Sequence, residues 1–261
     1  LEDNDLFFRT SPSDARQGQV IAELLQEKGI KSIAMTYTNN DYGKGLADAI
    51  QSNYEAAGGK VTINAAHEDG KGDYSAEVAA LSQAGGEILM VVGYLDQGGK
   101  GIIQSSLDAG AFSNFFLPDA MIGESLVKAI GPDLDGSIGT VPGTDSKGAE
   151  IYAELATKDG FTAGPYSPEA YDAAALTLLA MQAANSADSN AAKAKVFEVA
   201  NAPGTKILPG ELAKGLQILK DGGDIDYVGA TAVELIGAGE SAGSYREILV
   251  KDGKNTTVRY R

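Results

Sequence analysis

Apolar positions along the chain follow two spacings, one typical of strands and one typical of helices. Short apolar runs predict strands at residues 31–37, 61–66, 87–92, 112–117 and 137–141. Apolar side chains three or four positions apart predict helices between them, at residues 41–57, 74–84, 98–109 and 123–130. This alternation is typical of βαβ units. It predicts an α/β fold with a parallel sheet and helices on both faces.

The second part of the chain has a different pattern. Nearly every segment after residue 146 predicts helix, at residues 147–158, 167–185, 190–200 and 209–220. The end returns to strands at 245–250 and 256–260, around the hairpin signal Asp252-Gly253-Lys254. The helix-rich part contains too few predicted strands for a sheet of its own. We therefore expect its helices to need a sheet from elsewhere.

Composition narrows the functions to consider. The 261 residues are 43% hydrophobic and 22% charged, which is typical of a folded chain with one large or two small domains. The net charge of −15 disfavours nucleic acid and anionic membrane surfaces as partners. With no cysteine and one histidine, thiolate and multi-histidine metal sites are excluded, and we expect no metal or cofactor. No apolar run approaches the ~20 residues that a membrane-spanning helix needs.

Four loops follow the carboxyl ends of the predicted strands, where open parallel sheets bind ligands. They are residues 39–43, 67–74, 93–97 and 118–121. Three contain a tyrosine and all four contain an acid, a set that suits a small cationic or zwitterionic ligand rather than a phosphate. Tyr42, Tyr94 and Asp119 are the candidate ligand contacts from these loops.

Each loop residue also has a structural interpretation. Asp41 could cap the following helix, and Tyr42 could pack on that helix. Tyr74 is expected to pack on its own helix. His67 is expected on a surface loop rather than as a catalytic base.

One enzyme motif is present, at residues 239–243, where Gly-Glu-Ser-Ala-Gly matches the nucleophile elbow of α/β-hydrolases. That elbow requires a helix after the serine, whereas residues 244–250 predict a strand. The hydrolase order also places histidine last, and His67 lies far upstream. A hydrolase that uses Ser241 is therefore a remote alternative, and a glycine-rich connection is the favoured interpretation.

Four segments occur together in one protein family, in this order and spacing. They are residues 7–14 followed by Gln17-Gly18, then 40–46, 93–94 and 170–174. On these segments the chain resembles the periplasmic substrate-binding proteins of branched-chain amino acid (Leu/Ile/Val-type) ABC transporters, which have the type I periplasmic binding fold. The resemblance implies two Rossmann-like lobes with parallel sheets, joined by three crossovers near residues 8–10, 141–145 and 236–244, with the ligand in the cleft.

The resemblance also implies how the lobes are composed. Residues 9–142 and 240–261 match a complete C-terminal lobe, whereas residues 1–8 and 145–238 match only part of the N-terminal lobe. About 100 residues of the family pattern are missing from that lobe, on a scale of roughly 30 residues per βαβ unit. The chain begins at Leu1 without a signal-peptide pattern, and we expect a mature or truncated start.

The resemblance implies a periplasmic, non-enzymatic receptor. It would capture an aliphatic amino acid, such as leucine, and dock on a membrane permease. Tyr42 and Tyr94 correspond to aromatic contacts, Asp119 to the acidic partner of the ligand's ammonium group, and Tyr171 to a cleft position of the N-terminal lobe. A ligand-sensing domain of the same fold, for an amide, urea or an aromatic acid, is the alternative.

Overall fold

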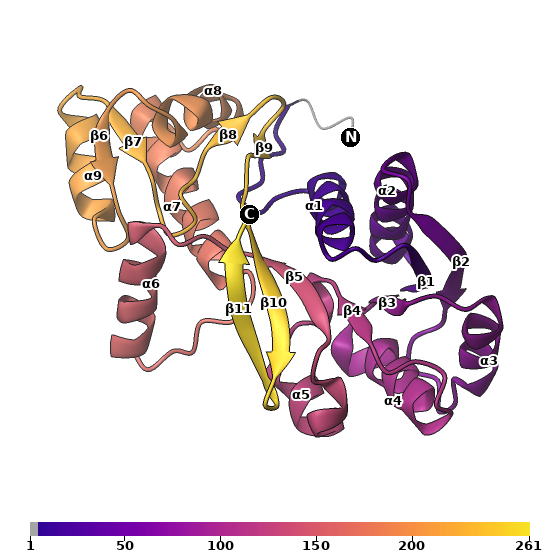
Figure 1. Ribbon diagram of the computed structural model, residues 1–261. Coiled ribbons are helices and arrows are strands. Elements are labelled where there is room, and N and C mark those ends of the chain that lie inside the picture. The colour runs from indigo at the N-terminus through magenta and orange to yellow at the C-terminus, as the bar shows by residue number, and fades with distance from the viewer. Residues whose placement is uncertain (1–4) are drawn as a thin grey trace. The chain divides into compact units, whose positions relative to one another are not determined.

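The computed structural model describes residues 5–261 and divides them into two compact units (Figure 1). The sheet unit consists of Asp14–Val141 and Tyr245–Arg261. The helical unit consists of the described part of Leu1–Ser13 and of Pro142–Ser244. The chain therefore passes from one unit to the other after residues 13, 141 and 244. The assignment of the units to lobes of a longer protein stays a prediction.

A seven-stranded sheet in the order β11-β10-β5-β4-β3-β1-β2 forms the centre of the sheet unit. Its strands are β1 (Ser32–Thr38), β2 (Lys60–His67), β3 (Ile88–Val92), β4 (Phe115–Leu117), β5 (Ile138–Pro142), β10 (Tyr245–Lys251) and β11 (Lys254–Tyr260). Adjacent strands from β2 to β5 pair in parallel, and β10 and β11 pair antiparallel. The predicted α/β class and each strand predicted for this unit are confirmed.

Helices cover both faces of this sheet because its central strands are apolar on both sides. In β3, Ile88, Met90 and Val92 share one core with α1 (Asp14–Glu27) and α2 (Asp41–Ala56). The alternate residues Leu89 and Val91 belong to the opposite core. That core contains residues of α3 (Ser75–Ala84), α4 (Lys100–Asp108), α5 (Glu124–Ile130) and the short turns η2 (Asp119–Met121) and η3 (Gly131–Leu134).

Helix α1 was not predicted from the sequence, although its buried residues Val20, Ile21, Leu24 and Leu25 have helical spacing. The helix packs on α2 at a close approach. A Cβ atom at Gly18 would lie 2.8 Å from the Ala49 side chain, so glycine permits this contact.

The start of α2 is capped by Asn40, not by Asp41 as one sequence interpretation proposed. The Asn40 side chain accepts a hydrogen bond from the Gly43 amide at 2.9 Å, and Asp41 is the first residue of the helix. Gly43 is required here because a Cβ atom would lie 2.1 Å from the Thr38 carbonyl oxygen. The cap and this close contact together fix the position of Tyr42, in the first turn of α2, relative to the end of β1.

The helical unit contains the four predicted helices and also two short strand pairs. Its helices are α6 (Lys147–Lys158), α7 (Ser167–Ala184), α8 (Ser189–Ala200) and α9 (Leu212–Lys220). Strands β6 (Thr205–Ile207) and β7 (Ile225–Tyr227) pair in parallel, and β8 (Leu235–Ile236) and β9 (Glu240–Ser241) pair antiparallel. These two-stranded pairs were not predicted, and the expectation that the helices of this part need a sheet from elsewhere stays a prediction. Three-residue strands are too short to show an apolar pattern.

A buried carboxylate fixes the loop after β7 in the helical unit. Asp172 of α7 accepts hydrogen bonds from the Tyr227 hydroxyl, the Ala230 amide, and the amide and hydroxyl of Thr231, at 2.7–2.8 Å. Burial raises the pKa of Asp172, and the four donors act in the opposite direction. The Asp172 carboxylate therefore holds the loop against α7 through four hydrogen bonds.

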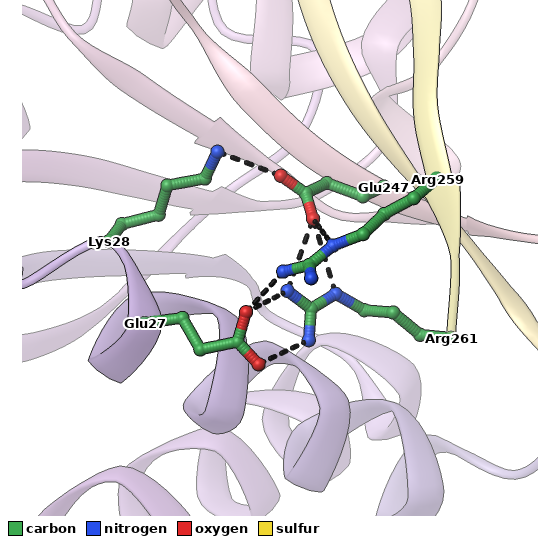
Figure 2. Close-up of polar contacts among 5 residues, drawn as sticks. All are labelled: Glu27, Lys28, Glu247, Arg259 and Arg261. Carbon is green, nitrogen blue, oxygen red and sulfur yellow. Dashed lines mark hydrogen bonds and ion pairs between the residues drawn. The ribbon is translucent and has the colours of Figure 1, made fainter.

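A second buried carboxylate joins the last hairpin to α1 in the sheet unit (Figure 2). Glu247 of β10 is 1% exposed and accepts from Lys28, Arg259 and Arg261, at 2.8, 2.8 and 3.1 Å. Both arginines also bind Glu27 at the end of α1. Burial acts to raise the pKa of Glu247, but the three cations outweigh it and hold the pKa below its ordinary value of 4.5.

We expect Glu247→Gln to destabilise the fold by about 2–3 kcal/mol in urea denaturation at neutral pH. The loss falls below that of a fully buried ion pair because two of the cations are partly exposed. Since the folded-state pKa is lowered, this stabilisation exists above pH 4.5 and is lost as the pH falls below it.

Glu27→Gln is the matched control, because the Glu27 side chain is 49% exposed and binds the same two arginines. It should cost clearly less than the Glu247 variant. Equal free energies of unfolding for the two variants would contradict the claim that the buried Glu247 carboxylate contributes more stability than the exposed Glu27 carboxylate.

Candidate functional site

Three of the four predicted ligand contacts lie at the carboxyl ends of neighbouring parallel strands. Tyr42 follows β1 at the start of α2, Tyr94 follows β3, and Asp119 follows β4 at the start of η2. Strands β1, β3 and β4 are adjacent in the sheet, so their ends meet at one edge. The sequence thus correctly predicted which loops lie together.

Tyr42 contacts each of the other two side chains. The Tyr42 and Tyr94 rings lie 5.3 Å apart between centroids with an interplanar angle of 35°. The Tyr42 hydroxyl donates a hydrogen bond to Asp119 Oδ1 at 3.1 Å. Asp119 is 5% exposed, whereas both tyrosines are partly exposed. The result is a carboxylate at the base of a partly accessible aromatic pair.

Gln17 is a further residue of this site that sequence reasoning did not select. Its side-chain amide donates to Asp119 Oδ1 at 2.8 Å and contacts the Thr140 hydroxyl at 3.4 Å, and Gln17 is itself buried. The signal that could have found it is the Gln17-Gly18 pair, which belongs to the segments that carry the family resemblance. Gly18 lets α1 approach α2, and this approach helps to place Gln17 beside Asp119.

The electrostatics keep the Tyr42 hydroxyl protonated. Burial and the neighbouring Asp119 carboxylate raise the pKa of Tyr42 far above its ordinary value of 10.0. The hydroxyl is therefore a permanent donor to Asp119 at neutral pH. Tyr42 and Gln17 are both neutral donors to this carboxylate.

Tyr171 lies in the other unit, on α7, and the structure does not group it with these three residues. Its hydroxyl accepts a hydrogen bond from the Gly210 amide at 2.8 Å, and its ring lies 5.3 Å from that of Tyr152. Through these contacts Tyr171 connects α7 to Gly210 and to Tyr152 of α6 within the helical unit. A ligand contact by Tyr171 stays a prediction.

His67 is buried, and its expected place on a surface loop was wrong. Strand β2 continues to His67, and the strand pleat turns this side chain inward, where it is 1% exposed. Tyr74 is also buried, and its ring lies against Gly101 of α4 rather than only on its own helix, because a Cβ atom at Gly101 would lie 2.5 Å from that ring.

Ser241 lies in the short strand β9, and the next element along the chain is β10. The helix that a nucleophile elbow needs after its serine is not there. Within residues 5–261, no three His, Cys, Asp or Glu side chains gather in a way that could hold a metal ion. Over the same residues no helix has the length and apolar character to cross a membrane.

Comparisons with known proteins identify the class that this fold and site define. The sequence profile of the periplasmic binding proteins matches residues 2–208. The chain therefore belongs to the type I periplasmic binding proteins, and its relatives are of the branched-chain amino acid transporter kind.

Two curated relatives illustrate the similarity. A Leu/Ile/Val-binding protein homolog 1 of Brucella melitensis is 34% identical over 188 residues, which are 70% of this chain and 49% of the relative. A leucine-, isoleucine-, valine-, threonine- and alanine-binding protein of Pseudomonas aeruginosa is 28% identical over 74% of this chain and 54% of the relative. The chain thus spans about half the length of these relatives.

Solved structures show the same fold at lower identity. A leucine binding protein, LivK, of Thermotoga maritima has a TM-score of 0.78 at 18% identity, over 97% of this chain and 67% of that one. A solute binding protein of R. palustris in complex with benzoate has a TM-score of 0.72 at 15% identity, over 97% and 64%. At these identities the likeness concerns the fold.

We expect Gln17→Glu to destabilise the protein more at pH 8 than at pH 5 in urea denaturation. The new carboxylate would lie about 2.8 Å from Asp119 Oδ1 in place of a donor, and the repulsion is relieved when the pair shares a proton.

Gln19→Glu adds the same charge to the exposed side of α1 and should change stability little at either pH. Similar urea midpoints for the two variants at pH 8 would contradict the contact between Gln17 and Asp119.

Proposed function

We propose that the protein is a solute-binding receptor of the periplasm that captures a small amino acid, branched-chain or otherwise aliphatic, and delivers it to an ABC permease. It performs no chemistry on the ligand. Proteins of this family bind substrates rather than convert them. The names of the two curated relatives above refer to the binding of leucine, isoleucine and valine, and one of them also refers to threonine and alanine.

The observation that carries the proposal is the Asp119 carboxylate at the base of the Tyr42–Tyr94 pair. An ammonium group gains a charge-assisted hydrogen bond from a carboxylate and a cation–π contact from a tyrosine face. Because Asp119 is buried and held by Gln17 and Tyr42, it is in place before the ligand arrives.

The same geometry argues against an aromatic acid as the main ligand. Some proteins of this fold bind benzoate, as the R. palustris structure shows for that protein. A ligand whose only charge is a carboxylate would meet the like charge of Asp119 and lose affinity. An amino acid presents an ammonium group to the same position.

We expect Asp119→Ala to weaken leucine binding about 100-fold, which corresponds to about 2.7 kcal/mol. The loss follows because the ligand's ammonium group would be desolvated without its anionic partner. Isothermal titration calorimetry with leucine, isoleucine, valine and alanine on the protein at its natural length measures it, with benzoate as the ligand that should not bind.

Asp96→Ala is the matched control, since Asp96 lies in the turn after Tyr94 and is exposed. It should bind with wild-type affinity. Near-wild-type affinity of a correctly folded Asp119→Ala variant, or selective binding of benzoate by the wild type, would overturn the proposal.

A further inference from the structure

His67, the chain's single histidine, packs against the segment that carries Tyr94. A Cβ atom at Gly93 would lie 3.2 Å from His67 Nε2, and one at Gly98 would lie 3.0 Å from it. The imidazole therefore contacts the position just before Tyr94 and a position within the turn η1 (Leu95–Gly99) that follows it. The mechanism proposed for ligand binding makes no use of this buried titratable group.

The hydrogen bonds around His67 indicate which neutral tautomer it adopts. The Thr36 hydroxyl donates its one proton to the Ala65 carbonyl oxygen at 2.9 Å. Its contact with His67 Nδ1, also 2.9 Å, must then be donated by Nδ1–H. Nε2 consequently carries a buried lone pair, and no residue among 5–261 donates a hydrogen bond to it.

Asp69 connects this histidine to the turn after Tyr94. Its Oδ1 accepts a hydrogen bond from the Gly98 amide at 3.0 Å and lies 3.9 Å from His67 Nε2. Its Oδ2 accepts from the Thr38 hydroxyl. Asp69 thus holds η1 against the end of β1, and the oxygen that holds Gly98 is also the acidic oxygen beside the imidazole.

The other charged groups around His67 are acidic. Burial lowers the pKa of His67 below its ordinary value of 6.5, while Asp69, Glu77 of α3 and Glu68 act in the opposite direction. Glu77 is paired with Lys71, whose ammonium lies over the Tyr74 ring, and that ring stands edge-on to His67 at 6.2 Å. A proton taken up at Nε2 therefore has Asp69 as its nearest anionic partner.

We propose that protonation of His67 releases the turn after Tyr94 and so weakens ligand binding in acid. The new Nε2–H draws Asp69 Oδ1 from its present 3.9 Å toward the ring, and this movement lengthens and weakens the hydrogen bond from the Gly98 amide. Turn η1 and Tyr94 then shift at the edge of the site. By linkage, a ligand that prefers the neutral form lowers the pKa of His67 by the same coupling. The ligand half of this inference rests on the proposed function.

Nuclear magnetic resonance on the ligand-free protein tests the switch itself, independently of any ligand. The single imidazole gives one set of ring signals, so no assignment ambiguity arises. We expect the Nδ1–H tautomer at pH 7.5, and the Gly98 amide signal should titrate with the same midpoint as the ring. An Nε2–H tautomer, a ring that does not titrate before acid unfolding, or a ring that titrates without the Gly98 amide would each overturn the proposal.

Calorimetry with leucine tests the coupling to the site. Affinity should fall about five-fold or more from pH 8 to a pH below the ring midpoint. His67→Asn should abolish this dependence, because an asparagine amide can still donate to Thr36 but does not titrate. Asp69→Asn, which retains an acceptor for Gly98, should move the midpoint to lower pH by removing the nearest anion.

Asp96→Asn is the control for this series, since it removes an exposed acid from the same turn, and it should keep the wild-type ratio of affinities. Persistence of the pH dependence in His67→Asn would overturn the coupling. Absence of leucine binding by the wild type at every pH would instead count against the proposed function, and the ligand-free resonance experiment would still decide the switch.

Discussion

The buried Glu247 carboxylate is the constraint on which the sheet unit depends. This unit is built from two distant segments, and Glu247 lies in the later one while Lys28 lies in the earlier one. The Glu247 carboxylate is 1% exposed, and its burial is compensated by ion pairs with three cations. These ion pairs hold the last hairpin beside the end of α1 (Figure 2), the helix that also contains Gln17.

The candidate site depends on the position of α1. Asp119 is held from two sides, by Gln17 from α1 and by Tyr42 from the start of α2. Each holding residue depends on a glycine that permits close packing, Gly18 for α1 against α2 and Gly43 for α2 against the end of β1. The carboxylate is consequently positioned by the fold before any ligand binds. The Tyr94 side of the site is supported by His67 through Asp69.

The sequence was sufficient for features that depend on local pattern. Buried strands such as β3 are apolar on both faces, and the rule that ligands bind at strand ends brought Tyr42, Tyr94 and Asp119 together correctly. The two-residue turn at Asp252 and Gly253 has positive φ at both positions, which the Asp-Gly signal predicts.

Features that depend on tertiary contact were missed. Gln17 meets Asp119 across 102 positions of sequence, and no local pattern reports such a contact. His67 was misplaced because strand β2 extends to it, and an error at a strand end changes which way a side chain faces. Strands β6 and β7 are held by the helices around them rather than by their own composition. The contacts of Tyr171 with Gly210 and Tyr152 are also tertiary, and no local sequence pattern predicts them.

Native mass spectrometry of the purified protein at its natural length tests the central claim most directly, because it weighs the chain and any retained ligand together. The account predicts a small adduct with the mass of one aliphatic amino acid, which is lost on denaturation. A chain that carries no adduct as purified, and that still takes up none after incubation with millimolar leucine, isoleucine, valine and alanine at pH 8, would contradict the account.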